Sequence, residues 1–173
     1  MNNKGYISVK ELALMAFLTA LLFVQEQLLS FLPNIQFTIF LLILYSKKLG
    51  FVKTSIIVIV HTILDNLVMG SFNAIYFPFM LTGWLFIPIG IKLFARKTNS
   101  ALILAIYSII FAFLYSFVFL IPNVIILNID IWAYLIADIP FEIILALSSF
   151  ITTLWLYQPC AKAFDRLLSQ NIE

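Results

Sequence analysis

Residues 101–121 read ALILAIYSIIFAFLYSFVFLI, an uninterrupted apolar run that ends before Pro122. An α-helix needs about 20 apolar residues to cross the hydrocarbon core of a bilayer, and this run contains no charged residue. The whole chain has the same character: 64% of its 173 residues are hydrophobic and 10% are charged. Soluble domains have about 45–50% and about 25%, respectively. The sequence therefore predicts one all-α integral membrane domain over residues 1–173.

Apolar segments on either side of this run complete a predicted bundle of six transmembrane helices. The expected helices cover residues 9–31, 34–46, 52–69, 73–95, 101–121 and 131–158. The second segment is too short to span the core upright, so we expect it to be tilted or to begin inside a cavity lined by protein. An amphipathic tail over residues 161–169 is expected to lie on the cytoplasmic membrane surface.

All of the lysines and arginines lie at one set of ends of these segments. They are Lys4, Lys10, Lys47, Lys48, Lys53, Lys92, Arg96, Lys97, Lys162 and Arg166. Basic residues beside membrane-spanning helices stay cytoplasmic, which predicts an N-in/C-in topology, with both termini cytoplasmic. Bases spread along one membrane face suit the anionic lipids of the bilayer and form no stripe for nucleic acid.

Motifs of enzymes and metal sites are missing from the chain. With a single histidine it has no His-Glu-x-x-His zinc motif. It also has no Gly-x-Ser-x-Gly motif and no glycine-rich phosphate loop. We therefore expect a non-catalytic membrane subunit with no metal and no cofactor.

Polar residues gather at the opposite, base-free ends of the helices and predict a substrate-binding cavity open to the outside. The expected site residues are Glu26, Asn34, Gln36, His61, Asp65, Asn66, Asn73, Tyr76, Asn128, Trp132, Asp138 and Glu142. Ionisable residues within a membrane segment cost at least about 2.5 kcal/mol each and usually face a cavity or one another. Because this end offers no base to an anion, a neutral or cationic solute fits better, unless backbone amides at broken helix ends hold an anion.

Several of these residues also have a purely structural interpretation. His61 and Asp65 are four residues apart, so they share a helix face and could satisfy each other. Asp138 and Glu142 have the same spacing, and two carboxylates on one buried face need a partner, a proton or a ligand. Trp132 could belong to an aromatic belt at head-group depth.

The first expected helix carries a face of small residues within the segment LALMAFLTAL, residues 12–21. Ala16 and Ala20 are four residues apart, and Ala13 lies beside them. Small residues at this spacing let another helix approach closely in lipid. That other helix belongs either to this protein's own bundle or to a partner.

These features together resemble the substrate-binding S components of energy-coupling factor (ECF) vitamin transporters. The resemblance rests on the short basic N-terminus, the Ala16-x-x-x-Ala20 face, the six-helix plan and the polar outer end. It implies that the protein captures a vitamin-class small molecule outside the cell and delivers it inward with a T component and two ABC ATPases. It also implies that Ala16 and Ala20, flanked by Ala13, dock on the T component. Among neutral or cationic vitamins we favour cobalamin or a related compound, because the outer end is rich in amides.

Two other classes of protein stay open. Cell-shape proteins of the MreD type are also small N-in bundles, and the stretch LDNLVMGS over residues 64–71, followed by Gly83, is similar to their central region. That alternative predicts cell-wall synthesis partners and no transport. A self-contained secondary carrier is the third class, although the sequence has no evident internal repeat.

Overall fold

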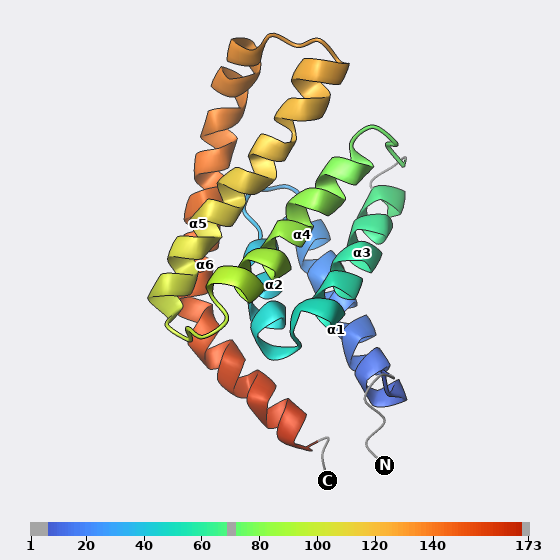
Figure 1. Ribbon diagram of the computed structural model, residues 1–173, viewed down its shortest axis with the longest axis vertical. Helices are drawn as coiled ribbons and strands as arrows, with labels where there is room; N and C mark the ends of the chain where they lie inside the picture. The colour runs from blue at the N-terminus through green and yellow to red at the C-terminus, as the bar shows by residue number, and fades with distance from the viewer. Residues whose placement is uncertain (1–6, 69–71, 171–173) are drawn as a thin grey trace.

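The computed structural model describes residues 7–68 and 72–170, with the backbone alone for residues 168–170. Lys4, Gly70 and the expected helix end at residue 69 lie outside this part of the chain. The described residues form helices and no strand. These are α1 (Val9–Leu29), α2 (Thr38–Lys48), α3 (Phe51–Val68), α4 (Phe77–Phe94), α5 (Ala101–Val118), the π-helical η1 (Ile121–Ile126) and α6 (Ile131–Gln170) (Figure 1).

Five helical segments of the described chain are long and apolar enough to cross a membrane. They are Val9–Leu29, Phe51–Val68, Phe77–Phe94, Ala101–Ile126 and Ile131–Leu167. The predicted all-helical architecture is confirmed, and these five segments fit a multi-pass membrane protein. The second expected helix is the exception, because α2 has only 11 residues.

The helices alternate in direction, so that α1 begins and α6 ends at the same end of the bundle (Figure 1). The turns from α2 to α3 and from α4 to α5 lie at this end as well. We call it the basic end, because the described bases accompany these helix ends. They are Lys10, Lys47, Lys48, Lys53, Lys92, Arg96, Lys97, Lys162 and Arg166.

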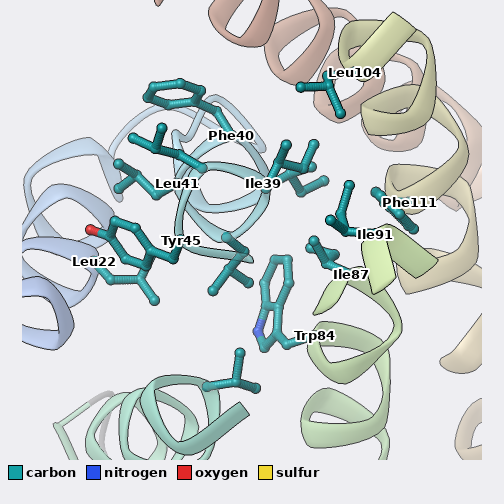
Figure 2. Packing of buried hydrophobic residues seen from close by; sticks show 14 of the residues in the cluster. Leu22, Ile39, Phe40, Leu41, Tyr45, Trp84, Ile87, Ile91, Leu104 and Phe111 are labelled. Atoms are coloured by element: carbon teal, nitrogen blue, oxygen red, sulfur yellow. The ribbon is translucent and has the colours of Figure 1, made fainter. Parts of the chain in front are cut away.

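Helix α2 forms the centre of the bundle and contacts each of the other five α-helices. Its residues 38–46 are all buried. Figure 2 shows Ile39 and Tyr45 of α2 among side chains of the surrounding helices, including Trp84 and Ile87 of α4. A helix that is apolar on all sides is expected in the core of a bundle, and α2 has this pattern.

The length of α2 leaves it well short of a membrane crossing. At 1.5 Å per residue, 11 residues extend about 16 Å, roughly half of the hydrocarbon core. The helix begins at Thr38, later than the expected residue 34. Pro33 removes an amide donor and disfavours helix at Leu32, and Asn34 adopts the left-handed conformation with φ 57°. The connection from α1 to α2 is therefore non-helical and enters the bundle.

Helix α6 is one continuous helix through Pro140 and Pro159, which differs from the expected helix over 131–158 and separate tail over 161–169. Both prolines are exposed, so the ring of each lies on the outer side of the helix. The C-terminal part stays with the bundle because Ala161 and Phe164 pack in the hydrophobic core. Lys48 and Asp165 add an ion pair at 2.7 Å.

Helices α4 and α5 approach closely at two glycines. A Cβ atom on Gly83 would lie 2.6 Å from a ring carbon of Tyr115, and one on Gly90 would lie 2.5 Å from a ring carbon of Phe111. Trp84 stacks on Tyr115 between them, with ring centroids 3.9 Å apart. The aromatic side chains of α5 thus fill the space that the two glycines leave on α4.

Replacing Gly90 with valine should destabilise the protein, because the new side chain overlaps with Phe111. Overpacking of this kind costs about 1–3 kcal/mol. Thermal unfolding of the detergent-solubilised protein measures the loss. Leu93→Val is the matched control on the same helix, since Leu93 is 65% exposed. An equal loss in both variants would contradict the close packing of α4 on α5.

Candidate functional site

A cavity of about 480 Å³ opens in the half of the bundle away from the basic end. Its walls come from the end of α1, the α1–α2 connection, the second half of α5 and the first half of α6. The lining residues are Glu26, Leu29, Ser30, Leu32, Pro33, Asn34, Ile35, Gln36, Tyr115, Ser116, Phe119, Tyr134, Asp138 and Leu145. Four of the expected site residues are among them: Glu26, Asn34, Gln36 and Asp138.

The floor of the cavity is the non-helical α1–α2 connection, which polar side chains hold in place. Gln25, buried on α1, accepts a hydrogen bond from the amide of Phe37 at 2.9 Å and donates to the hydroxyl of Thr38 at 2.8 Å. Thr38 in turn donates to Gln36 Oε1 at 2.9 Å. Asn34 donates to the carbonyl of Phe141 on α6 at 2.9 Å. Backbone inside a membrane must be satisfied by the protein itself, and these contacts do so at the start of α2.

One wall of the cavity is aromatic and acidic. Tyr115 and Phe119 of α5 meet edge to face, with ring centroids 5.2 Å apart. Opposite them, Asp138 lines the cavity from α6 and lies within hydrogen-bonding range of Tyr134. No lysine or arginine lines this cavity. Aromatic faces beside carboxylates attract cations and offer nothing basic to an anion.

Glu142 lies behind this wall and is 2% exposed. Its carboxyl is within hydrogen-bonding range of Asp138 and of the hydroxyl of Ser116. Of the two acids, Asp138 reaches the cavity and Glu142 supports it.

Two polar contacts brace α1 against α3 beside the cavity. Glu26 Oε2 lies 3.0 Å from His61 Nε2, in an orientation that makes no directed hydrogen bond. Gln27 donates to Asp65 Oδ1 at 3.2 Å. His61 and Asp65 therefore pair with α1 and not with each other. Glu26 lines the cavity and also contacts His61, so it takes part in both the cavity and the α1–α3 contact.

The remaining expected site residues do not line the cavity. Asn66 donates to the carbonyl of Thr62, and Asn73 accepts from the amide of Tyr76 at the start of α4. The Tyr76 hydroxyl donates to Asn123. Asn128 adopts the left-handed conformation, with φ 56°. Trp132 is 70% exposed, as its alternative interpretation as an aromatic-belt residue expects.

Ten residues that line the cavity are not among the expected site residues, and four of these, Tyr115, Ser116, Phe119 and Tyr134, supply ring and hydroxyl groups. The first three lie in the apolar run over residues 101–121, for which the sequence predicts only a membrane crossing. Tyr115 and Ser116 are adjacent polar side chains within this apolar run, and Phe119 follows Tyr115 by one helical turn. That local pattern was the available signal. No group of three His, Cys, Asp or Glu side chains that could hold a metal occurs among residues 7–68 and 72–170.

The alanine face of α1 borders a second, apolar groove of about 330 Å³ between α1 and α3. Its lining residues are Leu12, Met15, Ala16, Thr19, Ala20, Ile56, Ile57, Val60 and Leu64. Ala13, Ala16 and Ala20 are all exposed. In the described part of the chain, no helix of this bundle packs against the alanine face.

The contact between Glu26 and His61 should make a measurable contribution to stability. Glu26→Ala, His61→Ala and the double variant form a double-mutant cycle, and contacting charged residues typically couple by 0.5–3 kcal/mol. Thermal unfolding in detergent gives the three losses. His61 with Gln27, which contacts Asp65, is the control pair and should be nearly additive. Additive losses for Glu26 and His61 would show that the two side chains do not interact.

The comparisons with known proteins identify no relative. No family model matches the chain, no curated protein matches it, and no solved structure matches it.

Proposed function

We propose that the protein is the substrate-binding S component of an ECF-type importer in a bacterial cell membrane. The observation that carries the proposal is the base-free cavity with carboxylates and aromatic rings, located away from the basic end. Because basic residues stay cytoplasmic, the cavity opens to the outside and both termini are cytoplasmic. The α1–α2 connection and α2 together make the second of six crossings.

The solute is a neutral or cationic vitamin-class molecule. Glu26 and Asp138 supply negative charge, while Tyr115, Phe119 and Tyr134 supply ring faces. A cavity of about 480 Å³ has the size of ordinary small-molecule sites. This volume favours a vitamin with one to three rings over intact cobalamin, whose corrin and side chains are far bulkier.

Delivery of the solute requires partners, and the groove between α1 and α3 is the surface proposed for them. Ala16 and Ala20 are exposed at the helical spacing that admits another helix. The proposed occupant is the T component, which two ABC ATPases drive. ATP hydrolysis belongs to those partner subunits.

The MreD-like alternative receives support from one contact. Asp65 accepts a hydrogen bond from Gln27 and braces α1 against α3, a structural role that suits a protein without a solute. A cell-shape protein has no use for a solute cavity, so the alternative leaves the acidic wall at Asp138 without a role.

A panel of vitamins should identify the solute. Thiamine and its pyrimidine, riboflavin, cobalamin and a queuosine precursor are added separately to the detergent-solubilised protein, with biotin and pantothenate as anionic comparisons. A solute at a hundred times its dissociation constant should add about 2.7 kcal/mol of stability. Stabilisation by an anionic vitamin alone would contradict the proposed solute class.

Asp138→Asn should weaken binding of that solute by about tenfold or more, because a charged hydrogen bond contributes about 1.5–3 kcal/mol. Asp130→Asn is the matched control. Asp130 carries the same charge eight residues earlier, bonds the amide of Ala133 and does not line the cavity. Titration calorimetry measures both affinities. Equal affinities of the two variants would place the solute elsewhere.

Tryptophan at Ala16 or Ala20 should abolish uptake while solute binding to the isolated protein stays intact, because the bulky ring fills the groove. Uptake and co-purification are measured in cells that carry the native partners. Phe17→Trp is the control, since Phe17 lies on α1 outside the groove and is 64% exposed. Loss of solute binding in the Ala16 variant, or normal uptake, would overturn the docking assignment.

A further inference from the structure

A third cavity, of about 420 Å³, lies at the basic end, where α2, α3 and α4 meet. We call it the basic pocket, and it is lined by Ser46, Lys47, Gly50, Phe51, Pro88, Ile91, Lys92 and Arg96. The proposed uptake function gives this pocket no role, since the solute cavity is formed by other residues at the other side of the bundle. It contrasts with the solute cavity in having three bases and no acid in its lining.

The three cations of the basic pocket lack anionic partners. Two neighbouring lysines are neutralised, since Lys48 pairs with Asp165 at 2.7 Å and Lys53 pairs with Glu11 at 2.5 Å. Within residues 7–68 and 72–170, no carboxylate pairs with Lys47, Lys92 or Arg96. Like charges gathered around one cavity repel each other, so an anion in the pocket would relieve them.

Two of the three cations are held in place by contacts of their own. The Lys47 ammonium donates to the carbonyls of Ala95 and Arg96, at 3.1 and 2.8 Å. These carbonyls follow the C-terminus of α4, so Lys47 covers the partial negative charge that would repel an anion. The Lys92 ammonium lies over the Phe51 ring, 4.5 Å from its centroid.

The start of α3 adds a second favourable feature for an anion. Helix α3 begins at Phe51, and the first amides of a helix have no acceptor within the helix. Together with the helix dipole, these amides favour a negatively charged group. Gly50 precedes them with φ +82° and has no side chain, and a Cβ atom there would meet nothing within 4 Å. The path to the α3 amides is therefore open.

The surface around the basic pocket suits a lipid. Val52, Leu93 and Phe94 are 64%, 65% and 73% exposed beside the pocket residues Phe51 and Lys92. Acyl chains can lie on these apolar side chains while a phosphate enters the pocket. Basic pockets between membrane helices on the cytoplasmic side are known to take anionic head groups.

We propose that the basic pocket binds the phosphate group of an anionic phospholipid, with Lys92, Arg96 and the first amides of α3 as its donors. A phospholipid and free inorganic phosphate both present a phosphate anion, so either could bind in the pocket. The exposed apolar residues beside the pocket favour the lipid. This site is independent of the solute cavity, so failure of either proposal leaves the other standing.

The test measures binding of dioleoyl phosphatidylglycerol to the full-length protein in detergent, by native mass spectrometry and by thermal shift. Dioleoyl phosphatidylcholine is the zwitterionic comparison. The double variant K92Q/R96Q should bind phosphatidylglycerol at least about tenfold more weakly than the unaltered protein, because each base near the membrane surface contributes to the attraction. Phosphatidylcholine should bind both proteins equally and more weakly.

The double variant K97Q/K162Q is the matched control, because it removes the same charge from two exposed bases that do not line the pocket. It should keep the affinity of the unaltered protein. K92R/R96K keeps both charges and should also bind, which separates loss of charge from loss of fold. Equal weakening in the K97Q/K162Q variant would overturn the site. Equal stabilisation by inorganic phosphate at the same concentration would overturn the lipid as its ligand.

Discussion

The shortness of α2 is the constraint on which the rest of the structure depends. A buried helix of about 16 Å cannot cross a hydrocarbon core of about 30 Å, so the chain before it must enter the bundle without helical hydrogen bonds. Such backbone is stable at membrane depth only where the protein satisfies it. Gln25 and Ser148 provide hydrogen bonds to this backbone, and the connection itself lines the cavity. The connection that makes up for the short helix is therefore also a wall of the cavity.

Helix α1 connects this cavity to the groove proposed for docking. Glu26 faces the cavity and contacts His61 of α3, while Ala16 and Ala20, further back on the same helix, line the groove between α1 and α3. The two surfaces therefore share the same pair of helices. The contact between Glu26 and His61 joins these two helices beside the cavity. This arrangement gives the proposed function a route by which occupancy of the cavity can reach the groove.

Predictions from the sequence were correct for features that depend on local pattern. They were wrong where contacts between helices determine a helix end or a side-chain partner. Apolar runs predicted the helical fold, and the shortness of the second run left open whether that helix is tilted or begins inside the protein. Pro159 indicated a helix end, yet α6 continues through it, and Ala161, Phe164 and Asp165 contact the bundle beyond it. Spacing suggested that His61 pairs with Asp65, whereas both pair with α1, because contacts between helices leave no trace in the spacing within one helix.

The same limit applies to Tyr115, whose segment has the composition of a plain lipid-facing crossing. Its side chain lines the cavity because the glycines of α4 bring the two helices close together. A pattern within α5 indicates only that Tyr115 and Phe119 share a face. Which way that face points depends on Gly83, which lies in another helix.

The two ends of the bundle carry charge of opposite sign, with bases at the basic end and carboxylates at the cavity. At the basic end, Glu11 and Asp165 each neutralise a lysine, and the bases left over surround the basic pocket. Among the described residues that line the cavity there is no lysine or arginine, and Asp138 lies close to Tyr134 and Glu142. Each end therefore keeps uncompensated charge of one sign. The solute proposed for the cavity and the phospholipid proposed for the basic pocket would each meet charge of this kind.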